Sequence, residues 1–343
     1  MSQRSQRKEE HLALAKMFFN KQKKSDFNQI HLIRPALAET QFSENSLESS
    51  LFNHRISMPI YINAMTGGSE KSFQINKRLA KACAKENIPM ALGSASILEK
   101  EPDQLNSFSI ARSENPDGLL FANINPDTNA HSAEKIIKEL NADALQIHLN
   151  TVQEAVMPEG DRNFIWLDNL KRIRDKVDIP IIIKEVGQGL DPASIQTLQK
   201  NGFSNFDLGG SGGTNFAQIE NERRELHDLA FLEDIGLSTP KALLGAKLIK
   251  QKKVIFASGG INNSMNIFKS LVLGANYVGL ASHFLKFAFR GSDELCAEIE
   301  KIKSELIMLN ALFGLNQIKD ARKVKYYLDN ELFNYQKQIE KIY

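Results

Sequence analysis

A cluster of polar side chains lies near the middle of the chain, where a β-rich run gives way to a helix-like segment. Gln146, His148 and Asn150 alternate with apolar residues, and Gln153 and Glu154 follow. Strand alternation places the first three side chains on one face. Burying such a face without partners costs about 1–3 kcal/mol per group. The pattern therefore favours a functional site over the alternative of a single satisfied core histidine.

A lysine ends the next β-rich run. Lys184 follows three isoleucines, and Glu185 comes directly after it. A lysine in this position is ordinarily solvated or paired with a neighbour such as Glu185. The functional alternative is a fixed positive charge against an anionic cofactor ring.

Glycine-rich turns follow four other runs. Residues 63–68 contain two glycines and Thr66, which suits either close approach of a planar ligand or an ordinary turn. Residues 209–214 lack the Gly-Lys-Ser/Thr of a nucleotide-binding loop, yet their N–H groups form a nest that suits an oxyanion, with a flexible hinge as the alternative. Residues 258–260 and 279–282 match the two turns that commonly hold a phosphate in barrels, together with a helix N-terminus.

Eight β-rich runs, each followed by a segment of helical spacing, position these turns. They span residues 59–64, 89–93, 118–123, 144–149, 180–184, 205–209, 253–257 and 276–280. Strands that alternate with helices imply parallel pairing, and eight such units close into an α/β fold, the (β/α)8 TIM barrel. An open doubly wound sheet is the alternative, but no Gly-x-Gly-x-x-Gly follows the first run.

The barrel leaves residues at both ends of the chain. We expect an N-terminal arm and lead-in over residues 1–57, the barrel over 58–290 and a helical C-terminal extension over 291–343. Ile299, Ile302, Leu306 and Met308 have the spacing of one helical face in that extension. The longest connection between strands, residues 210–252, should lie on the loop-bearing face.

Composition excludes several classes of protein. The 343 residues carry 43 Lys+Arg against 41 Asp+Glu, a net charge of +2 that is too balanced for a dedicated nucleic-acid binder. Cys83 and Cys296 lie far apart, which argues for a reducing compartment and against a structural zinc site. No apolar stretch resembles a secretory signal or a membrane span. We expect a soluble cytoplasmic protein.

With these segments placed, nearly the whole chain resembles the type II isopentenyl-diphosphate isomerases, which are flavin-dependent barrels. The resemblance rests on several motifs in one order: residues 7–11, 61–68, 148–150 with Gln153 and Glu154, 157–160, 184–187, 212–216 with 219–221, and 258–260. The family implies interconversion of isopentenyl and dimethylallyl diphosphate with reduced FMN, Mg²⁺ and NADPH to reduce the flavin. It also implies a homo-oligomer, a tetramer or octamer.

The resemblance assigns site residues in three groups. FMN would contact Met65, Thr66, Gly67, Ser94, Asn123, Lys184, Gly209 and Thr214, with its phosphate at Gly259, Gly260, Ile261, Asn262, Ala281 and Ser282. The substrate would contact Arg7, Lys8, His11, Ser94, Ala95, Ser96 and Gln153. His148, Asn150 and Gln153 would be catalytic, and Glu154 would bind Mg²⁺.

The chain departs from the family at three places. It has Gly209 where a serine is usual, Ile235 where a tryptophan is common, and small side chains at residues 94–96. Moving a double bond needs a proton added at one carbon and removed at another. Gln153 cannot titrate and no pair of carboxylates stands out, so the flavin is expected to supply the proton.

Two other functions are compatible with such a barrel. One is an FMN-dependent 2-hydroxy-acid oxidase or dehydrogenase, but no His-x-x-Arg lies near the seventh run. The other is a non-catalytic flavin- or phosphate-binding scaffold, which predicts loss of the polar strand ends. Phe284, Phe287 and Phe289 suit either a partner surface or the core.

Overall fold

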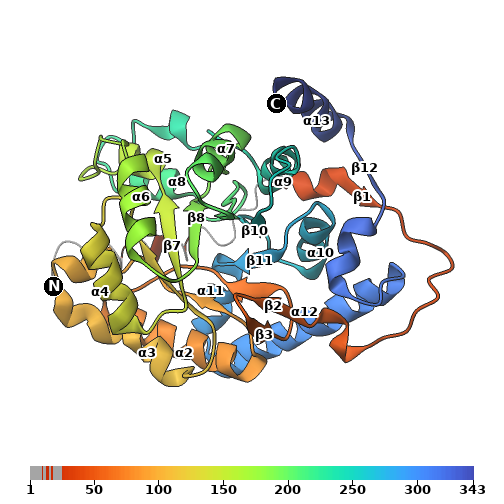
Figure 1. Ribbon diagram of the computed structural model, residues 1–343, viewed down its shortest axis with the longest axis horizontal. Coiled ribbons are helices and arrows are strands. Elements are labelled where there is room, and N and C mark those ends of the chain that lie inside the picture. Colours follow the sequence, from red (N-terminus) through yellow and green to blue (C-terminus); the bar gives the residue numbers. More distant parts are fainter. Residues whose placement is uncertain (1–9, 11–12, 15–16, 18–24) are drawn as a thin grey trace.

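Eight parallel strands close into a barrel at the centre of the molecule (Figure 1). The computed structural model describes residues 10, 13, 14, 17 and 25–343. The barrel strands are β4 (Ile60–Ile62), β5 (Met90–Ala91), β6 (Leu120–Ile124), β7 (Ala144–Leu149), β8 (Ile181–Glu185), β9 (Asn205–Asp207), β10 (Val254–Ser258) and β11 (Tyr277–Leu280). Each lies within or overlaps one of the eight predicted runs, and β11 pairs with β4 to complete the circle. The predicted TIM barrel is confirmed.

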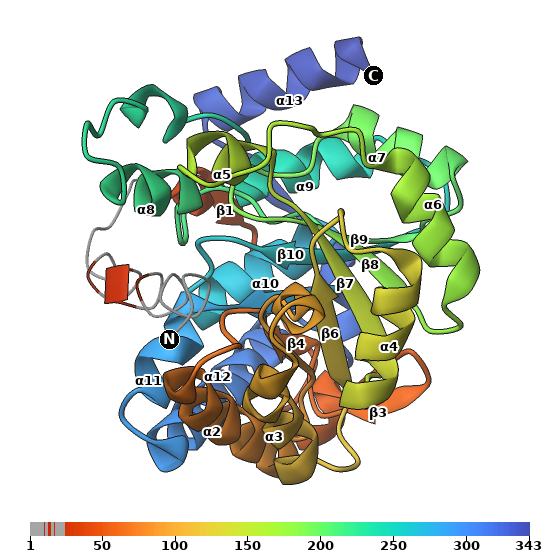
Figure 2. The ribbon, with the colours of Figure 1, turned by 90° about the vertical axis from the view of Figure 1, so that its left-hand side faces the viewer.

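Helices surround the strands (Figure 2). They are α2 (Glu70–Glu86), α3 (Asn106–Glu114), α4 (Ala130–Leu140), α5 (Thr151–Val156), α6 (Leu167–Lys176), α7 (Pro192–Lys200), α8 (Phe216–Glu222), α9 (Thr239–Lys247), α10 (Ser264–Val272), α11 (Ser282–Ala288) and α12 (Ser292–Leu312). In α2, Ser69 caps the first turn and Ile75, Leu79 and Cys83 form a buried stripe. The long connection over residues 210–252 contains α8 and α9 rather than only loop.

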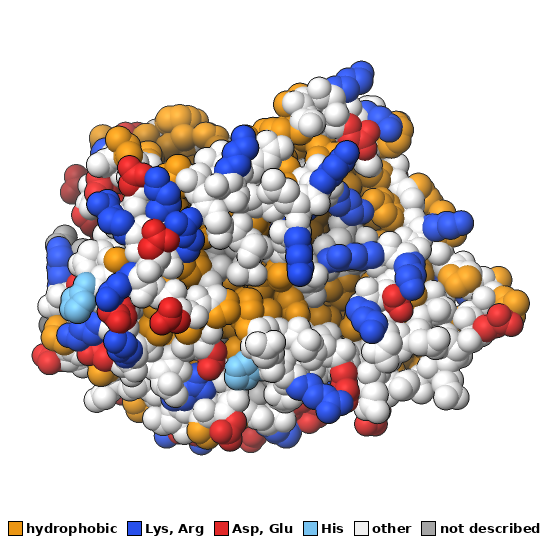
Figure 3. Space-filling model, viewed as in Figure 1, with side chains coloured by type: hydrophobic (Ala, Val, Ile, Leu, Met, Phe, Trp, Pro, Cys, Tyr) orange, Lys and Arg blue, Asp and Glu red, His pale blue; other side chains and the backbone are white. Residues whose placement is uncertain are grey.

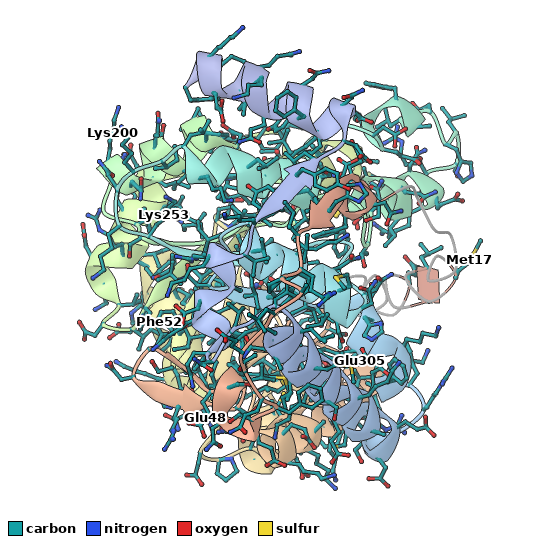
Figure 4. All side chains as sticks on the ribbon, turned by 90° about the vertical axis from the view of Figure 1, so that its right-hand side faces the viewer. Met17, Glu48, Phe52, Lys200, Lys253 and Glu305 are labelled. Atoms are coloured by element: carbon teal, nitrogen blue, oxygen red, sulfur yellow. The ribbon has the colours of Figure 1, made fainter. Side chains whose placement is uncertain are left out.

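Aromatic side chains fill the N-terminal end of the barrel. Tyr61, Phe121 and Phe256 are fully buried inside it. Phe52, at the turn between β2 (Ser49–Leu51) and β3 (His54–Ile56), has its ring centroid 6.2 Å from that of Phe121 and 6.5 Å from that of Phe256. Figure 4 shows Phe52 and Met17 on opposite sides of the molecule. Aromatic side chains therefore fill the barrel interior at the end away from the strand-end turns.

The two ends of the chain meet outside the barrel. β1 (Ile30–Leu32) pairs antiparallel with β12 (Tyr326–Leu328), and α13 (Asn330–Ile342) packs against α9. The remaining short elements are 3-10 helices: η1 (Asp26–Gln29), η2 (Glu44–Leu47), η3 (Ser96–Glu99), η4 (Pro102–Leu105), η5 (Ala230–Leu232) and η6 (Ile318–Lys323). Within the described part of the chain, no helix combines the length and apolar character needed to cross a membrane.

The predicted C-terminal helix is present, but one of the four residues predicted to lie on its apolar face is exposed. In α12, Ile299, Ile302 and Leu306 are buried against the barrel, but Met308 is 47% exposed and lies on another face. Phe284 is fully buried, so for this residue the core prediction is confirmed and the partner-facing alternative is wrong. Phe287 and Phe289 are partly buried against the same core.

Candidate functional site

A cavity of about 620 Å³ lies at the C-terminal ends of the barrel strands. Ten predicted site residues line it: Met65, Ser94, Ser96, Asn123, His148, Asn150, Gln153, Glu154, Lys184 and Thr214. They come from six of the eight strand ends, as expected for a barrel whose chemistry gathers on this face. The lining also contains polar residues that the sequence did not single out, among them Glu99, Asn125, Asp127 and Asp161.

Other predicted residues lie beside this cavity rather than in its wall. Thr66, Gly67 and Ala95 are buried behind it, and the Thr66 hydroxyl is 2.6 Å from that of Ser72. Gly259, Gly260, Ile261 and Asn262 follow β10, while Ala281 and Ser282 follow β11. Arg7, Lys8 and His11 lie outside the described residues.

A hydrogen-bonded row of polar side chains crosses from inside the barrel to the cavity. Asn123 Nδ2 donates to the fully buried Gln146 Oε1 at 3.1 Å, and Asn123 Oδ1 lies 2.8 Å from His148 Nδ1. Because Asn123 Oδ1 can only accept, this contact assigns the proton to Nδ1 of His148. The polar face predicted for the fourth strand is thus present and partly paired, although Gln146 Nε2 is buried without a hydrogen-bond partner among the described residues.

Gln153 is held by a network that the sequence did not reveal. Its Nε2 donates to Glu220 Oε1 at 3.0 Å, and Glu220 on α8 is fully buried. Arg223 contacts three carboxylates: Glu220 at 2.5 Å, Glu159 at 2.9 Å and Glu10 at 3.1 Å. Burial lowers the pKa of Arg223, but the hydrogen-bonded Glu159 and Glu220 outweigh it, so the pKa is raised and the charge is permanent. A carboxylate therefore contacts Gln153 directly.

Hydrogen bonds to both carboxylate oxygens fix the orientation of Glu154. Oε1 accepts from Asn150 Nδ2 at 3.0 Å and Oε2 accepts from the Asp161 N–H at 2.9 Å. Nearby, burial raises the pKa of Asp127, and the charges of Asp161 and Glu154 add to that rise. Among the described residues no group of three or more His, Cys, Asp or Glu could bind a metal by itself. A Mg²⁺ ion here would need ligand oxygens beside Glu154, which is its usual mode of binding.

Lys184 pairs with a carboxylate that is not its neighbour in sequence. The Lys184 side chain is 7% exposed, with Nζ 3.3 Å from Asp207 Oδ2 and 3.0 Å from the Glu185 carbonyl oxygen. The Glu185 side chain turns away, because its Oε2 accepts the N–H groups of Gly187, Gln188 and Gly189 at 2.6–2.8 Å. The expectation that Lys184 is solvated or paired with the Glu185 carboxylate is therefore wrong.

The glycine-rich turns after β9 and β10 pack main chain against main chain. Gly209 has a φ of +50°, and a Cβ there would lie 1.9 Å from the Glu185 carbonyl oxygen. The serine usual in the resembled family therefore does not fit this backbone. A Cβ on Gly259 would lie 1.8 Å from the Gly210 oxygen. Within the described chain no acceptor pairs with the N–H groups of Gly259 and Gly260, which leaves them for an anion.

The donor set of the cavity suits a flat, polar cofactor. Lys184 and Thr214 supply donors, Asn123 and Ser94 supply amide and hydroxyl groups, and all four line one cavity. Asn150 Oδ1 is buried and has no hydrogen-bond partner among the described residues. A buried polar atom without a partner is costly unless a ligand or water satisfies it. The residues present therefore fit a flavin with its phosphate at the adjacent glycines.

A second cavity, of about 710 Å³, lies at the opposite end of the barrel, on the face drawn in Figure 3. Several of its polar groups are already paired. Arg55 lies 2.6 Å from Glu48, Arg322 donates to the Gly274 carbonyl oxygen at 2.8 Å, and the Tyr277 hydroxyl donates to Ser50. Although it is larger, it lacks the strand-end carboxylates, imidazole and amides of the first cavity, which we take as the functional site.

Comparison with known proteins points to one family. The model of the family described as FMN-dependent dehydrogenase matches residues 97–326. A protein of Limosilactobacillus reuteri (strain JCM 1112) named isopentenyl-diphosphate delta-isomerase is 40% identical, over 98% of both chains. Proteins of the same name from Staphylococcus haemolyticus and Streptomyces sp. (strain CL190) are 39% and 40% identical, covering 98% and 96% of this chain and 97% and 91% of their own.

The solved structures that resemble this chain share its fold at low identity. Mandelate oxidase superimposes with a TM-score of 0.63 at 13% identity, over 93% of this chain and 90% of that one. A complex of a mandelate oxidase variant with the monooxide FMN adduct gives 0.62 at 14% identity over 93% and 92%. At such low sequence identity the structural similarity supports the barrel fold but gives no information about the substrate.

The Glu185 carboxyl should make stability depend on pH. Burial raises its pKa to about 7 from 4.5, against the N–H groups of residues 187–189, which lower it. Between these values the folded chain keeps a proton that the unfolded chain has lost, so stability falls as pH rises, by up to about 1.4 kcal/mol per pH unit. In Glu185→Gln an amide oxygen can accept the same N–H groups without titrating.

Urea denaturation of both proteins at a series of pH values checks this expectation. The free energy of unfolding of wild type minus that of Glu185→Gln should decrease from pH 4.5 to 7 and level off above. A difference that is constant or increases with pH over this interval would contradict the raised pKa.

Proposed function

The chain belongs to the FMN-dependent, type II isopentenyl-diphosphate delta-isomerases, and we propose that its strand-end cavity moves the double bond between isopentenyl and dimethylallyl diphosphate. It is an isomerase, so the reaction has no net oxidation or reduction. The observation that carries the assignment of the site is the arrangement around Gln153. This amide faces the cavity and contacts the buried Glu220, with Asn150 and Glu154 beside it.

The proton transfers set the roles of these residues. One carbon of the substrate gains a proton and another loses one, and an alkene is a very weak base. Reduced FMN, when bound, would supply the proton and stabilise the positive charge that develops. Gln153 cannot titrate, so its amide would orient the allyl group, while the Glu220 carboxylate, 3.0 Å away, accepts from that amide and holds it in place. His148 and Asn150 would contact the substrate from the fourth strand.

The flavin would be held along one side of the cavity. Lys184, Asn123, Ser94, Met65 and Thr214 would contact the ring and ribityl chain. Thr66, Gly67 and Gly209 would support it through main chain, with no side chain possible at Gly209 without backbone movement. The phosphate would accept hydrogen bonds from the unpaired N–H groups of residues 259–262 and contact Ala281 and Ser282. Backbone donors gathered in this way favour an anion.

The substrate diphosphate would sit on the other side. Glu154 would bind Mg²⁺ together with diphosphate oxygens and waters, and Ser94, Ala95 and Ser96 would border the substrate. Arg7, Lys8 and His11 would contact the diphosphate from the arm. The contact of Glu10 with Arg223 supports this part of the proposal, because it brings the arm next to α8 and Gln153.

Four further features belong to the proposal, the first three because the family implies them and the last because the composition indicates it. NADPH would reduce the flavin before the first turnover, and Mg²⁺ would be required throughout. The protein would form a homotetramer or octamer, and it would act in the cytoplasm.

Oxidation of a 2-hydroxy acid is the second candidate. Such enzymes pair a catalytic histidine with an arginine that fixes the substrate carboxylate. The residues that follow β10 here are Gly259, Gly260, Ile261 and Asn262. The described turn therefore lacks the side chains that this reaction requires, and the isomerase remains the better assignment.

Anaerobic incubation with isopentenyl diphosphate, FMN, Mg²⁺ and NADPH tests the proposal. Dimethylallyl diphosphate should form, and omission of FMN should abolish its formation. If the flavin is bound and reduced and no dimethylallyl diphosphate appears, the proposed function is wrong.

Glu154→Gln tests the metal site. The amide keeps the size of the side chain but removes the charge that would bind Mg²⁺, so activity at a fixed Mg²⁺ concentration should fall at least ~10–100-fold, since even outer-shell changes cost that much. Flavin binding, followed by absorbance, should be retained. Glu99→Gln is the matched control, because Glu99 lines the same cavity but contacts Asn129. Equal Mg²⁺ dependence in wild type and Glu154→Gln would refute the assignment.

A further inference from the structure

A fully buried carboxylate lies beneath the wall of the cavity at the end of β9. Asp207 has no exposed surface and is contacted by polar groups on four strands or the turns that follow them. It accepts hydrogen bonds from the Tyr61 hydroxyl (2.6 Å), Asn63 Nδ2 (3.3 Å), the Ser258 hydroxyl (2.5 Å) and the Gly209 N–H (3.3 Å), and it forms an ion pair with Lys184 Nζ (3.3 Å). The two carboxylate oxygens are therefore saturated by protein donors, and Asp207 itself is withdrawn from any ligand.

Lys184 connects this carboxylate to the cavity. Its ammonium forms an ion pair with Asp207 and donates a hydrogen bond to the Glu185 carbonyl oxygen. An ammonium has three N–H groups and Lys184 also lines the cavity wall, so it can still donate to a ligand there. The position of the ammonium is thus set from behind by two fixed acceptors.

The Tyr61 hydroxyl remains a hydrogen-bond donor to Asp207. Burial, the charge of Asp207 and its hydrogen bond raise the pKa of Tyr61 well above the ordinary value, so the phenol stays a donor. A buried ion pair is a weak source of stability, because well-packed apolar residues commonly do as well. The cost of burying this charge therefore suggests a task beyond holding the strands together.

We propose that Asp207 is a positioning residue that sets the electrostatic effect of Lys184 on the bound flavin. This inference rests on the proposed function, in which Lys184 contacts FMN. Reduction adds electron density to the flavin ring, so a nearby cation stabilises the reduced form more than the oxidised form. The negative charge of Asp207 opposes that effect and keeps the midpoint potential lower than Lys184 alone would make it.

Asp207→Asn tests the inference through the midpoint potential of bound FMN, measured anaerobically against a reference dye. An Asn can keep its oxygen toward Lys184 and turn its amide toward the Ser258 hydroxyl, which can accept. The potential should become more positive. At an effective dielectric constant of about 20, removing a unit charge changes the ratio of the dissociation constants of oxidised and reduced FMN by on the order of tenfold. For a two-electron reduction this corresponds to a shift of about 30 mV in the midpoint potential.

Tyr61→Phe supplies an independent test if Asp207→Asn does not fold. It removes a donor from the same oxygen, Oδ2, that pairs with Lys184. That oxygen becomes more negative, so the potential should shift in the opposite direction, to a smaller extent. Tyr277→Phe is the matched control, since this hydroxyl donates to Ser50 at the other end of the barrel, and it should leave the potential unchanged.

The outcomes separate this inference from the proposed function. If wild type binds no FMN, both are wrong. If wild type binds FMN but Lys184→Met leaves its potential unchanged, or if Asp207→Asn and Tyr61→Phe shift it in the same direction or not at all, the inference alone is overturned. Opposite shifts, with Tyr277→Phe unchanged, support it, because a purely structural role would not reverse sign.

Discussion

The buried ion pair of Asp207 and Lys184 is the constraint on which the functional end of this barrel depends. Asp207 joins Tyr61 and Asn63 near the end of β4, Lys184 on β8 and Ser258 on β10. A charge without exposed surface needs such partners, since removal of one partner from a buried pair typically costs about 3–5 kcal/mol. The first, fifth, sixth and seventh strand ends are therefore held together around one carboxylate.

Two walls border the cavity, and the buried ion pair lies behind one of them. On one side Lys184 is fixed beside the glycine turns after β9 and β10, whose main chains approach too closely for any Cβ at Gly209 or Gly259. On the other side the helices α5 and α8 bring Gln153 to Glu220, and Arg223 ties Glu220 to Glu159. At the opposite end aromatic side chains fill the barrel interior, so both walls border the cavity at the strand ends.

The sequence predicts the barrel well because its signals are local. Each strand is a short apolar run followed by helical spacing, and the polar alternation around His148 marks the fourth strand end. Contacts between distant segments carry no such signal. The pairing of β1 with β12 joins three-residue strands, and the partners of Gln153 and Lys184 lie 67 and 23 residues away in sequence. Asp207 was not predicted as a site residue. It is a charged residue between Phe206 and Leu208 in a buried strand, and this position could have indicated a role.

In the proposed mechanism this cavity binds a reduced flavin, which would promote isomerisation without being consumed. The most direct measurement follows the flavin spectrum and the formation of dimethylallyl diphosphate in one anaerobic sample whose flavin has been reduced beforehand. Many product molecules should form per flavin while the spectrum remains that of the reduced cofactor. Oxidation of the flavin in proportion to product, or a yield limited to one product per flavin, would contradict it.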